Sequence, residues 1–390
     1  MRWLNCVFYY WKQEYRRVLC DIDVLVFFVL LPLAYPILYA LIYNPEVVTD
    51  VPIVVVDNNR SALSRDVVRN LDASPSVDVV GYCANVQEAQ EAMMQRACYA
   101  ILVVPADVDE KVWRGEQATL VFYVDMSLLL KYKALYMALT DAVLDVSASL
   151  RLRSLPIGVS NSLIQVAQQP IPYTSVVLYN STSGIASFLI PAVLILILQQ
   201  SFLLGIAMLA AARHEKSCGW YDAHNVTAQL IGRTFCYLSL YILNIVYLLH
   251  FVPWLFGYPQ MGSIVNILLF ALPLVLSSIF MATTLSLWVR EREHVYLMFV
   301  FTSVIFIFLS GIAWPRYAMP TVWRYLSYII PSTWGVEGFV QINTMGASLE
   351  QVSHSYCCLW RLVMFYAFTA VLAMRYDVYR HKYKIYSKKD

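Results

Sequence analysis

Long stretches without a charged residue constrain this chain more than any other feature of its sequence. Four stretches have no Asp, Glu, Lys or Arg: residues 24–43, 184–212, 234–289 and 295–315. A helix rises about 1.5 Å per residue, so about 20 apolar residues cross a bilayer core about 30 Å thick. Three of the stretches therefore predict one membrane-spanning helix each. The third in order, 56 residues long, predicts two helices separated by the turn from Pro253 to Gly262, which contains two prolines and two glycines.

A sixth crossing is expected at residues 356–374, although Arg361 lies within it. A long arginine side chain can bury its stem and keep its guanidinium at the nearer headgroups.

Hydrophobic residues make up 59% of the sequence and charged residues only 14%, which is too apolar for a soluble protein. The 28 basic residues nearly balance the 26 acidic ones, which argues against a nucleic-acid partner. We therefore predict a membrane α-helical protein with six transmembrane helices in a lipid bilayer.

The basic residues indicate the orientation, because Lys and Arg in short loops stay on the cytoplasmic side. One set of segments holds 15 of them in 65 positions: residues 1–23, 213–233, 290–294 and 375–390. The other set, residues 44–183 and 314–361, holds 13 in 188 positions. Both termini are therefore expected to be cytoplasmic. The first crossing is too long for the apolar core of a signal peptide and lacks a small-residue cleavage site, so we interpret it as an anchor.

The segment between the first two crossings, residues 44–183, has the pattern of one soluble α/β domain. Short β-branched runs predict strands at residues 51–56, 77–82, 99–104 and 118–124. Helical stretches alternate with them, one capped by Ser61 and the others at residues 86–96, 107–113 and 132–150. This alternation predicts a largely parallel sheet. The predicted fold is thus six transmembrane helices with an inserted α/β extracytoplasmic domain.

Two features of this domain invite a functional interpretation. Asp57, Asn58 and Asn59 follow the first strand and could bind a cation or a ligand there. We favour a turn and helix cap instead, because Asp and Asn commonly form such turns. Cys83 follows one predicted strand and Cys98 precedes the next, so they are expected near opposite ends of parallel strands. This placement disfavours a disulfide.

The motifs that the chain lacks narrow its function. No GxxxxGK[ST] loop is present, so any ATP must be bound and hydrolysed by another chain. No GxSxG or HExxH motif occurs, and no array of Cys and His suggests a metal site. We therefore expect neither an enzyme nor a cofactor in this chain. The five clearer crossings also lack the charged residues that ion-coupled carriers usually need near the membrane midplane.

The polar residues within the crossings are mild ones. Gln199 and Gln200 lie in the second crossing, and Asn244 lies in the third. We favour hydrogen bonding between helices for these side chains. The alternative is that they line a translocation path and contact the substrate.

Several short motifs follow one another in a particular order. They are Pro52–Asp57 with Ser61 and Arg65, Leu178–Asn180 before Phe188–Pro191, Gly311–Pro315 with Met319 and Pro320, and then Pro331, Glu337 and Gly346. In their order and spacing, the chain resembles permease subunits of type-2 ATP-binding-cassette exporters, in the subgroup with a large outer domain between the first two helices. Two positions depart from that pattern. Ser181 stands where a proline is common, and Ser217–Trp220 stands where Gly-Thr is common.

The resemblance implies partners and a division of the chain. Two cytoplasmic ATPase subunits would bind ATP and Mg, the permease would form a homodimer or a heterodimer with a paralogue, and a periplasmic adaptor is a further partner of some such exporters. The implied segments are an amphipathic elbow helix at 1–21, transmembrane helix 1 at 22–43, the outer domain at 44–183, helices 2–6 at 184–375 with a coupling loop at 213–233 and short outer helices at 314–350, and a basic tail at 376–390. The aromatic side of the elbow helix is expected to rest in the headgroup plane.

The resemblance also implies site residues. Coupling to the ATPase would involve Arg213, His214, Glu215, Lys216, Arg290, Glu291, Arg292 and Glu293. Glu215 is expected to make the central contact. Alternatively, the first run only supplies charge that sets orientation, and the alternating charges of the second satisfy one another in water. An outer gate would comprise Trp314, Pro315, Pro320, Pro331 and Glu337.

The expected function is therefore that of a permease subunit of an ATP-driven exporter in a bacterial inner membrane. It would move an amphipathic or hydrophobic substrate, such as a drug or a lipid, along a path at the subunit interface lined by the second and fifth crossings. Two alternatives stay open. One is a membrane-anchored receptor or scaffold with a ligand-binding ectodomain, and the other is an ion-coupled secondary carrier.

Overall fold

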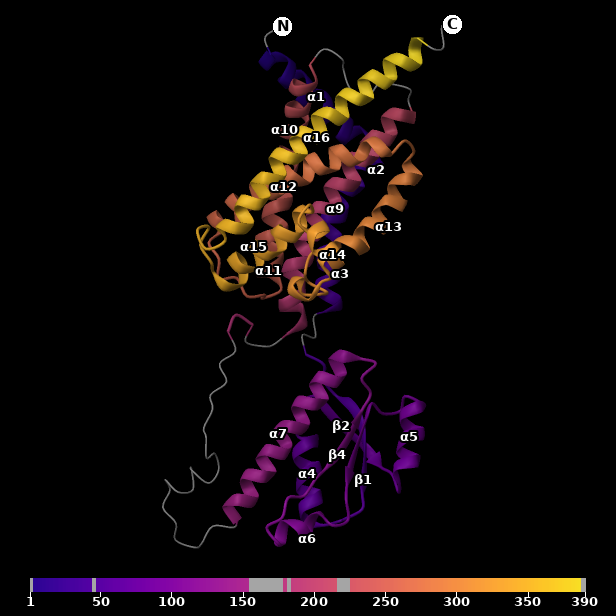
Figure 1. The fold of residues 1–390 in the computed structure, drawn as a ribbon, viewed down its shortest axis with the longest axis vertical. Coiled ribbons are helices and arrows are strands. Elements are labelled where there is room, and N and C mark those ends of the chain that lie inside the picture. The colour runs from indigo at the N-terminus through magenta and orange to yellow at the C-terminus, as the bar shows by residue number, and fades with distance from the viewer. Residues whose placement is uncertain (1–2, 44–46, 154–177, 181–183, 216–224, 387–390) are drawn as a thin grey trace. The chain divides into compact units, whose positions relative to one another are not determined.

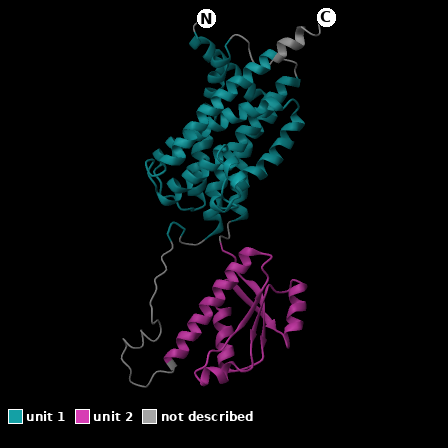
Figure 2. Cartoon of the chain, viewed as in Figure 1, with its two compact units in different colours: residues 1–46, 177–390 teal, residues 47–176 magenta. Residues whose placement is uncertain are grey.

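The computed structural model describes residues 3–43, 47–153, 178–180, 184–215 and 225–386. The chain divides into two compact units, residues 1–46 with 177–390 and residues 47–176 (Figure 2). We call the first the helical unit and the second the α/β unit. The α/β unit falls inside the segment that the sequence predicts as an inserted domain, residues 44–183.

Six segments among the described residues are long and apolar enough to cross a membrane, in agreement with the predicted number. They are Ile22–Ile42, Ile185–Glu215, Val226–Leu255, Ile264–Trp288, Arg292–Leu309 and Ser353–Tyr379. Their main helices are α2 (Ile22–Leu25), α3 (Leu31–Ile42), α9 (Ile185–Glu215), α10 (Val226–Val246), α11 (Val252–Leu255), α12 (Ile264–Leu285), α13 (Arg292–Leu309) and α16 (Ser353–Tyr386). Short π-helical turns, Val26–Leu30 and Tyr247–Phe251, connect α2 to α3 and α10 to α11. The sixth segment begins three residues before the expected start of the sixth crossing, and its Arg361 is exposed.

The helix α9 forms the centre of the helical unit. It contacts α3, α12, α13 and the short helix α15 (Pro331–Met345). All side chains from Leu194 to Arg213 are buried. A helix that is apolar on every side is expected to be enclosed by others, and the mostly apolar sequence of α9 fits this position. A movement of α9 would therefore displace helices that pack against it.

Loops and short helices gather at the two ends of the helical unit (Figure 1). The helix α1 (Trp3–Cys20) and the C-terminal part of α16 lie at one end, which we call the terminal end. The helices α14 (Thr321–Ser327) and α15 lie at the other, which we call the distal end. A short 3-10 turn, Arg316–Ala318, precedes α14. Short helices thus occur in the segment 314–350, where the resemblance implied them.

The helix α1 packs along α10. Gly232 permits this approach, because a Cβ at that position would lie 2.6 Å from the backbone oxygen of Val7. Tyr10, Glu14 and Val18 lie four residues apart on one side of α1, and all three are buried. The expected helix is present. However, Tyr10 and Val18 belong to the side that the aromatic pattern assigned to lipid headgroups, and that assignment is wrong for these two residues because they pack against protein.

The α/β unit contains a four-stranded sheet flanked by helices. The strands are β1 (Val51–Asp57), β2 (Val77–Tyr82), β3 (Ala100–Val104) and β4 (Val121–Val124), in the order β2-β1-β3-β4. The strand β1 runs parallel to β2 and β3, and β4 is antiparallel to β3. The helices are α4 (Ala62–Asp72), α5 (Val86–Met94), α6 (Val108–Trp113) and α7 (Leu129–Arg153). This is the largely parallel sheet that the sequence predicted.

The two faces of this sheet carry separate apolar clusters. The larger cluster joins inward-facing strand residues to α4 and α7, with Leu71 and Leu135 fully buried in it. The smaller one lies on the side of α5 and includes Ala89 and Cys98. Cys83 packs against this same cluster, and both thiols are free. Helices on both faces explain why the central strands read as continuous apolar runs rather than alternating ones.

The turn after β1 is held by Asp57. Its Oδ1 accepts hydrogen bonds from the backbone N–H groups of Asn59 at 3.0 Å and Arg60 at 2.8 Å, and its Oδ2 accepts one from the Ser64 hydroxyl at 2.7 Å. The Ser61 hydroxyl caps α4 by accepting from the Ser64 N–H at 3.0 Å. The carboxylate is thus used by its own loop, which favours the turn-and-cap interpretation over a ligand site.

Candidate functional site

A buried carboxylate joins three helices at the terminal end. Glu14 of α1 is 1% exposed and lies between α9 and α10. Its Oε2 pairs with the guanidinium of Arg213 on α9 and lies 3.5 Å from Nε of Arg233 on α10. Its Oε1 accepts a hydrogen bond from the Tyr237 hydroxyl at 2.5 Å. We call Glu14, Arg213, Arg233 and Tyr237 the Glu14 cluster.

The Glu14 cluster holds its carboxylate in the charged form. Burial by itself would raise the pKa of Glu14, but the charges of Arg213 and Arg233 and the hydrogen bond from Tyr237 outweigh burial and lower the pKa to about 2. Both arginines are more than nine-tenths buried. Removing one partner of such a buried arrangement costs about 3–5 kcal/mol, because the remaining charge stays buried without compensation. The cluster therefore fixes α1 firmly to α9 and α10.

The Glu14 cluster was not among the sites predicted from the sequence. Arg213 and Arg233 were both assigned to the predicted coupling loop at 213–233, Arg213 as a contact with the ATPase and Arg233 only as the last residue of the loop. A signal was nevertheless present: Tyr10, Glu14 and Val18 follow a four-residue spacing, so a carboxylate lies within an otherwise apolar stripe of a helix. A charge in such a stripe is expected to have a buried partner.

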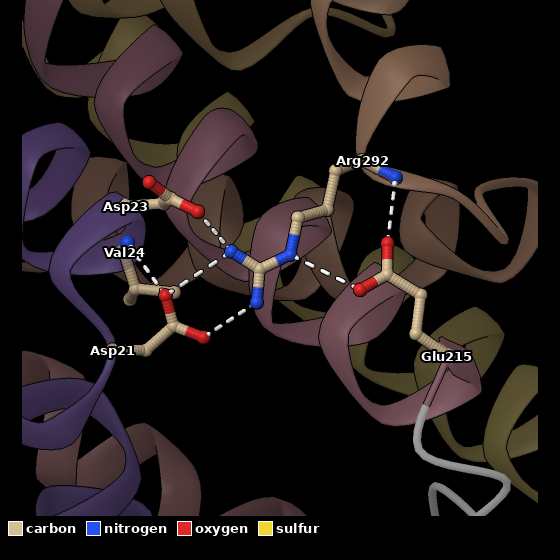
Figure 3. A network of polar contacts seen from close by, with 5 residues as sticks. All are labelled: Asp21, Asp23, Val24, Glu215 and Arg292. Carbon is tan, nitrogen blue, oxygen red and sulfur yellow. Dashed lines mark hydrogen bonds and ion pairs between the residues drawn. The ribbon is translucent and has the colours of Figure 1, made fainter.

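A second cluster surrounds Arg292, the first residue of α13, as Figure 3 shows. Its guanidinium donates to Asp21 Oδ2 at 2.8 Å, pairs with Asp23, and donates from Nε to Glu215 Oε2 at 3.2 Å. Asp21 is the N-cap of α2, Asp23 lies in α2, and Glu215 ends α9. We call Asp21, Asp23, Glu215 and Arg292 the Arg292 cluster. It joins the ends of the first, second and fifth spans at one point.

The Arg292 cluster differs from the Glu14 cluster in exposure and in charge. The side chain of Glu215 is 42% exposed and that of Arg292 is 27% exposed, so water screens these pairs. Three carboxylates face one guanidinium, and the cluster has an excess of negative charge. Such an arrangement can exchange partners, because a basic group from another molecule would find an accessible carboxylate in Glu215.

The structure places the predicted coupling residues in different surroundings. Glu215 and Arg292 contact each other, whereas Arg213 belongs to the Glu14 cluster. Arg290 and Glu293 are exposed, and Glu291 lies 3.5 Å from His294. His214 is partly buried, and Lys216 lies outside the described residues. The alternative that the run from Arg290 to Glu293 satisfies its own charges is wrong for Arg292, because its partners come from α9 and from the start of the first span.

The three predicted path residues are buried between helices. Gln199 Oε1 accepts a hydrogen bond from the backbone N–H of Ser332 at 2.6 Å, at the start of α15. Gln200 lies 3.4 Å from the hydroxyls of Thr302 and Ser303 on α13. Asn244 donates to the backbone oxygen of Phe28 at 2.8 Å. These contacts agree with the favoured role in helix-to-helix hydrogen bonding, and contact with a substrate stays a prediction.

The residues predicted for the outer gate lie at the distal end. Glu337 on α15 accepts a hydrogen bond from Arg316 at 2.8 Å. Pro331 is buried as the first residue of α15, where a missing N–H costs nothing. Trp314, Pro315 and Pro320 are exposed. The structure thus brings only Glu337 of this set into an ion pair among the described residues.

An apolar pocket of about 440 Å³ opens at the distal end. Its lining comes from the last turns of α13, the following segment and α14: Val304, Ile305, Phe308, Leu309, Trp314, Met319, Pro320 and Trp323. Its volume lies within the range of about 300–1,000 Å³ that is typical of small-molecule sites. Its residues are almost entirely hydrophobic, so it suits an apolar group. Two predicted gate residues, Trp314 and Pro320, belong to this lining.

Among the described residues, no group of three or more His, Cys, Asp or Glu side chains could hold a metal ion. None of the curated proteins compared with the sequence matches it. A family model described as "ABC-2 family transporter protein" matches residues 22–372, which is most of the chain and covers the whole α/β unit and most of the helical unit. The six spans, the inserted unit and the clustered charges at the terminal end all lie within or beside that match. The chain belongs to the ABC-2 family of transporter proteins, as a multi-pass membrane permease that works with separate ATP-binding-cassette ATPase subunits.

Proposed function

We propose that this permease is an exporter whose terminal end faces the cytoplasm and the ATPase subunits. Its α/β unit would then lie on the opposite side of a bacterial inner membrane, since among the described residues one span precedes that unit and five follow it. The dense basic residues near both termini support this orientation. ATP and Mg would be bound by two ATPase subunits on other chains.

The observation that carries the proposal is the Arg292 cluster. Force applied at Glu215 would reach α9 directly, α13 through Arg292, and the first span through Asp21 and Asp23. A basic residue of an ATPase subunit that approached Glu215 would compete with Arg292 for the carboxylate. Binding of the ATPase would thereby loosen α13 from α9 at this end, while the Glu14 cluster keeps α1, α9 and α10 together.

The cargo we propose is amphipathic or hydrophobic, such as a drug or a lipid. Two features support it: residues 24–43, 184–212, 234–289 and 295–315 lack charged side chains, and the pocket at the distal end is apolar. Six spans are few to enclose a route, so we propose a homodimer or a heterodimer with a paralogue, with a path between subunits along α9 and α13. Gln200 bridges these two helices and would be uncovered if they separated. An adaptor on the far side would be compatible with the inserted unit.

Co-purification and transport test the proposal together. The tagged chain, isolated from its own membranes, should retain an ATPase subunit, and inside-out vesicles should take up a lipophilic dye when ATP is added. Glu215→Gln and Arg292→Gln should each lower ATP-dependent uptake about fivefold or more, because coupling between sites is typically of that size. Glu350→Gln, an exposed carboxylate at the distal end, is the matched control.

Other outcomes would replace the proposal. Uptake that collapses with an ionophore and survives ATP depletion would identify an ion-coupled carrier. Ligand binding to the α/β unit without any uptake would favour a receptor or scaffold. Retention of an ATPase with full uptake in both variants would leave a permease whose coupling does not pass through the Arg292 cluster.

A further inference from the structure

A cation already occupies an aromatic and acidic site at the distal end. The guanidinium carbon of Arg316 lies 4.5 Å from the ring centroid of Trp334 and 5.6 Å from that of Tyr328. The two rings stack on each other with centroids 5.4 Å apart. The Nη1 atom of Arg316 donates to Glu337 Oε2 at 2.8 Å. We call Tyr328, Trp334 and Glu337 the aromatic cage, with Arg316 as its occupant.

The chemistry of the aromatic cage suits a positive charge. The face of an aromatic ring attracts cations, and aromatic cages bind quaternary ammonium groups in other proteins. Glu337 supplies a carboxylate beside the rings, and its side chain is 36% exposed, so a ligand can reach it. Arg316 is 24% exposed and is carried by a short turn rather than by a long helix. A residue on a short turn can move at lower cost than one within a long helix.

Neighbouring segments of the chain build the cage and line the apolar pocket. Trp314 and Met319 line the pocket on either side of Arg316 in sequence. Leu309, another lining residue, accepts a hydrogen bond through its backbone oxygen from the Thr333 hydroxyl at 3.2 Å, next to Trp334. The cage and the hydrophobic cavity of about 440 Å³ are therefore linked through residues next to Arg316 and Trp334 in sequence. A molecule with a cationic head and an apolar body matches both parts.

We propose that the aromatic cage and the apolar pocket together form a binding site for cationic amphipathic molecules, in which the cationic head of the ligand replaces Arg316. The role of this site in transport rests on the proposed export function, whereas binding itself does not. Arg316 acts as an internal competitor: it neutralises Glu337 when no ligand is bound, and it withdraws when the ligand enters. Charged substrates would thereby be distinguished from neutral ones of the same shape.

Binding can be measured on the full chain without an ATPase. The probe is octyltrimethylammonium, and the neutral control is the same octyl chain with an uncharged tert-butyl head of similar size. Equilibrium dialysis compares nanodiscs that contain the protein with empty nanodiscs, which corrects for partition into lipid. Arg316→Gln removes the internal competitor, and Arg361→Gln removes a positive charge from an exposed position of α16.

The cationic probe should bind Arg316→Gln about tenfold more tightly than the wild type, and the neutral compound should show no such gain. Arg361→Gln should leave both affinities within twofold of the wild type. Adding Glu337→Gln to Arg316→Gln should abolish the gain. An equal gain for the neutral compound, or no gain for the cation, would overturn the proposal.

Thermal unfolding establishes that each variant is folded before binding is interpreted. If Arg316→Gln does not fold, Arg316→Lys retains a positive charge but replaces the planar guanidinium, and it should raise the affinity for the cation by about twofold or more. An unchanged affinity in that variant would count against the proposal. The outcome is independent of export, because a chain that exports nothing can still bind the probe, and an active exporter can fail to bind it.

Discussion

Replacing Glu14 by Gln exchanges one carboxylate oxygen for an amide nitrogen. This small change should nevertheless strongly weaken the attachment of α1 to α9 and α10. The variant keeps the size of the side chain and an oxygen that can accept from Tyr237, but it removes the negative charge shared by Arg213 and Arg233. The pKa of Glu14 lies at about 2 rather than 4.5. A difference of about 2.5 in pKa, at about 1.36 kcal/mol for each pKa unit, corresponds to about 3 kcal/mol of stability. This agrees in size with the cost of breaking a buried ion pair.

The assay is thermal unfolding of the full chain in nanodiscs, at one scan rate for all variants. Domains of about 150–250 residues lose about 2–4 °C per kcal/mol, so Glu14→Gln should lower the Tm of the helical unit by about 6–12 °C. Glu350→Gln should lower it by less than about 2 °C, because this carboxylate is exposed. A Tm of Glu14→Gln within 2 °C of the wild type would refute the reasoning.

The pH dependence of the same effect has a definite sign. Because the pKa of Glu14 is depressed in the folded chain, its contribution is complete above about pH 4.5 and is lost as the pH falls toward about 2. The difference in Tm between wild type and Glu14→Gln should therefore shrink over that interval. A difference that stays constant from pH 6 to pH 3 would show that the carboxylate acts through its shape and not through its charge.

Two further predictions concern helix contacts. Gly232→Leu should separate α1 from α10, because even a Cβ at this position would lie 2.6 Å from the backbone oxygen of Val7. Faster hydrogen exchange in α1 would reveal the separation, and unchanged exchange would contradict the prediction. Ser61→Ala removes the cap of α4 and should destabilise the α/β unit by about 1 kcal/mol, with faster exchange confined to the first turn of α4, whereas Ser127→Ala should have no such effect.

The sequence allowed the spans and the sheet to be predicted because both depend on local patterns. Apolar stretches that lack charge must be removed from water wherever they lie, and so the number of spans followed from the gaps between charged residues. The cap at Ser61 and the turn at Asp57 were also predictable, since their partners lie within seven residues. Such contacts require no knowledge of how distant segments meet.

The charge clusters were not predictable by the same means. Glu14 meets a residue 199 positions away in Arg213, and Arg292 meets Asp21 across 271 positions. The basic residues were interpreted as signals of orientation, a role that depends only on their side of the membrane. Their pairing depends on which helices are neighbours, and spacing within one helix does not reveal this. Arg316 was likewise overlooked, because the gate was inferred from Trp, Pro and Glu residues around it.

The central proposal is that the terminal end and the α/β unit lie on opposite sides of the membrane, and labelling of single added cysteines tests this proposal directly. Trp113→Cys in the α/β unit and Arg290→Cys at the terminal end both replace exposed side chains. A membrane-impermeant maleimide added to cells with a permeable outer envelope should label Trp113→Cys above the background of the eight native cysteines, and should label Arg290→Cys only after the inner membrane is opened. Labelling of both positions from the same side would contradict the account.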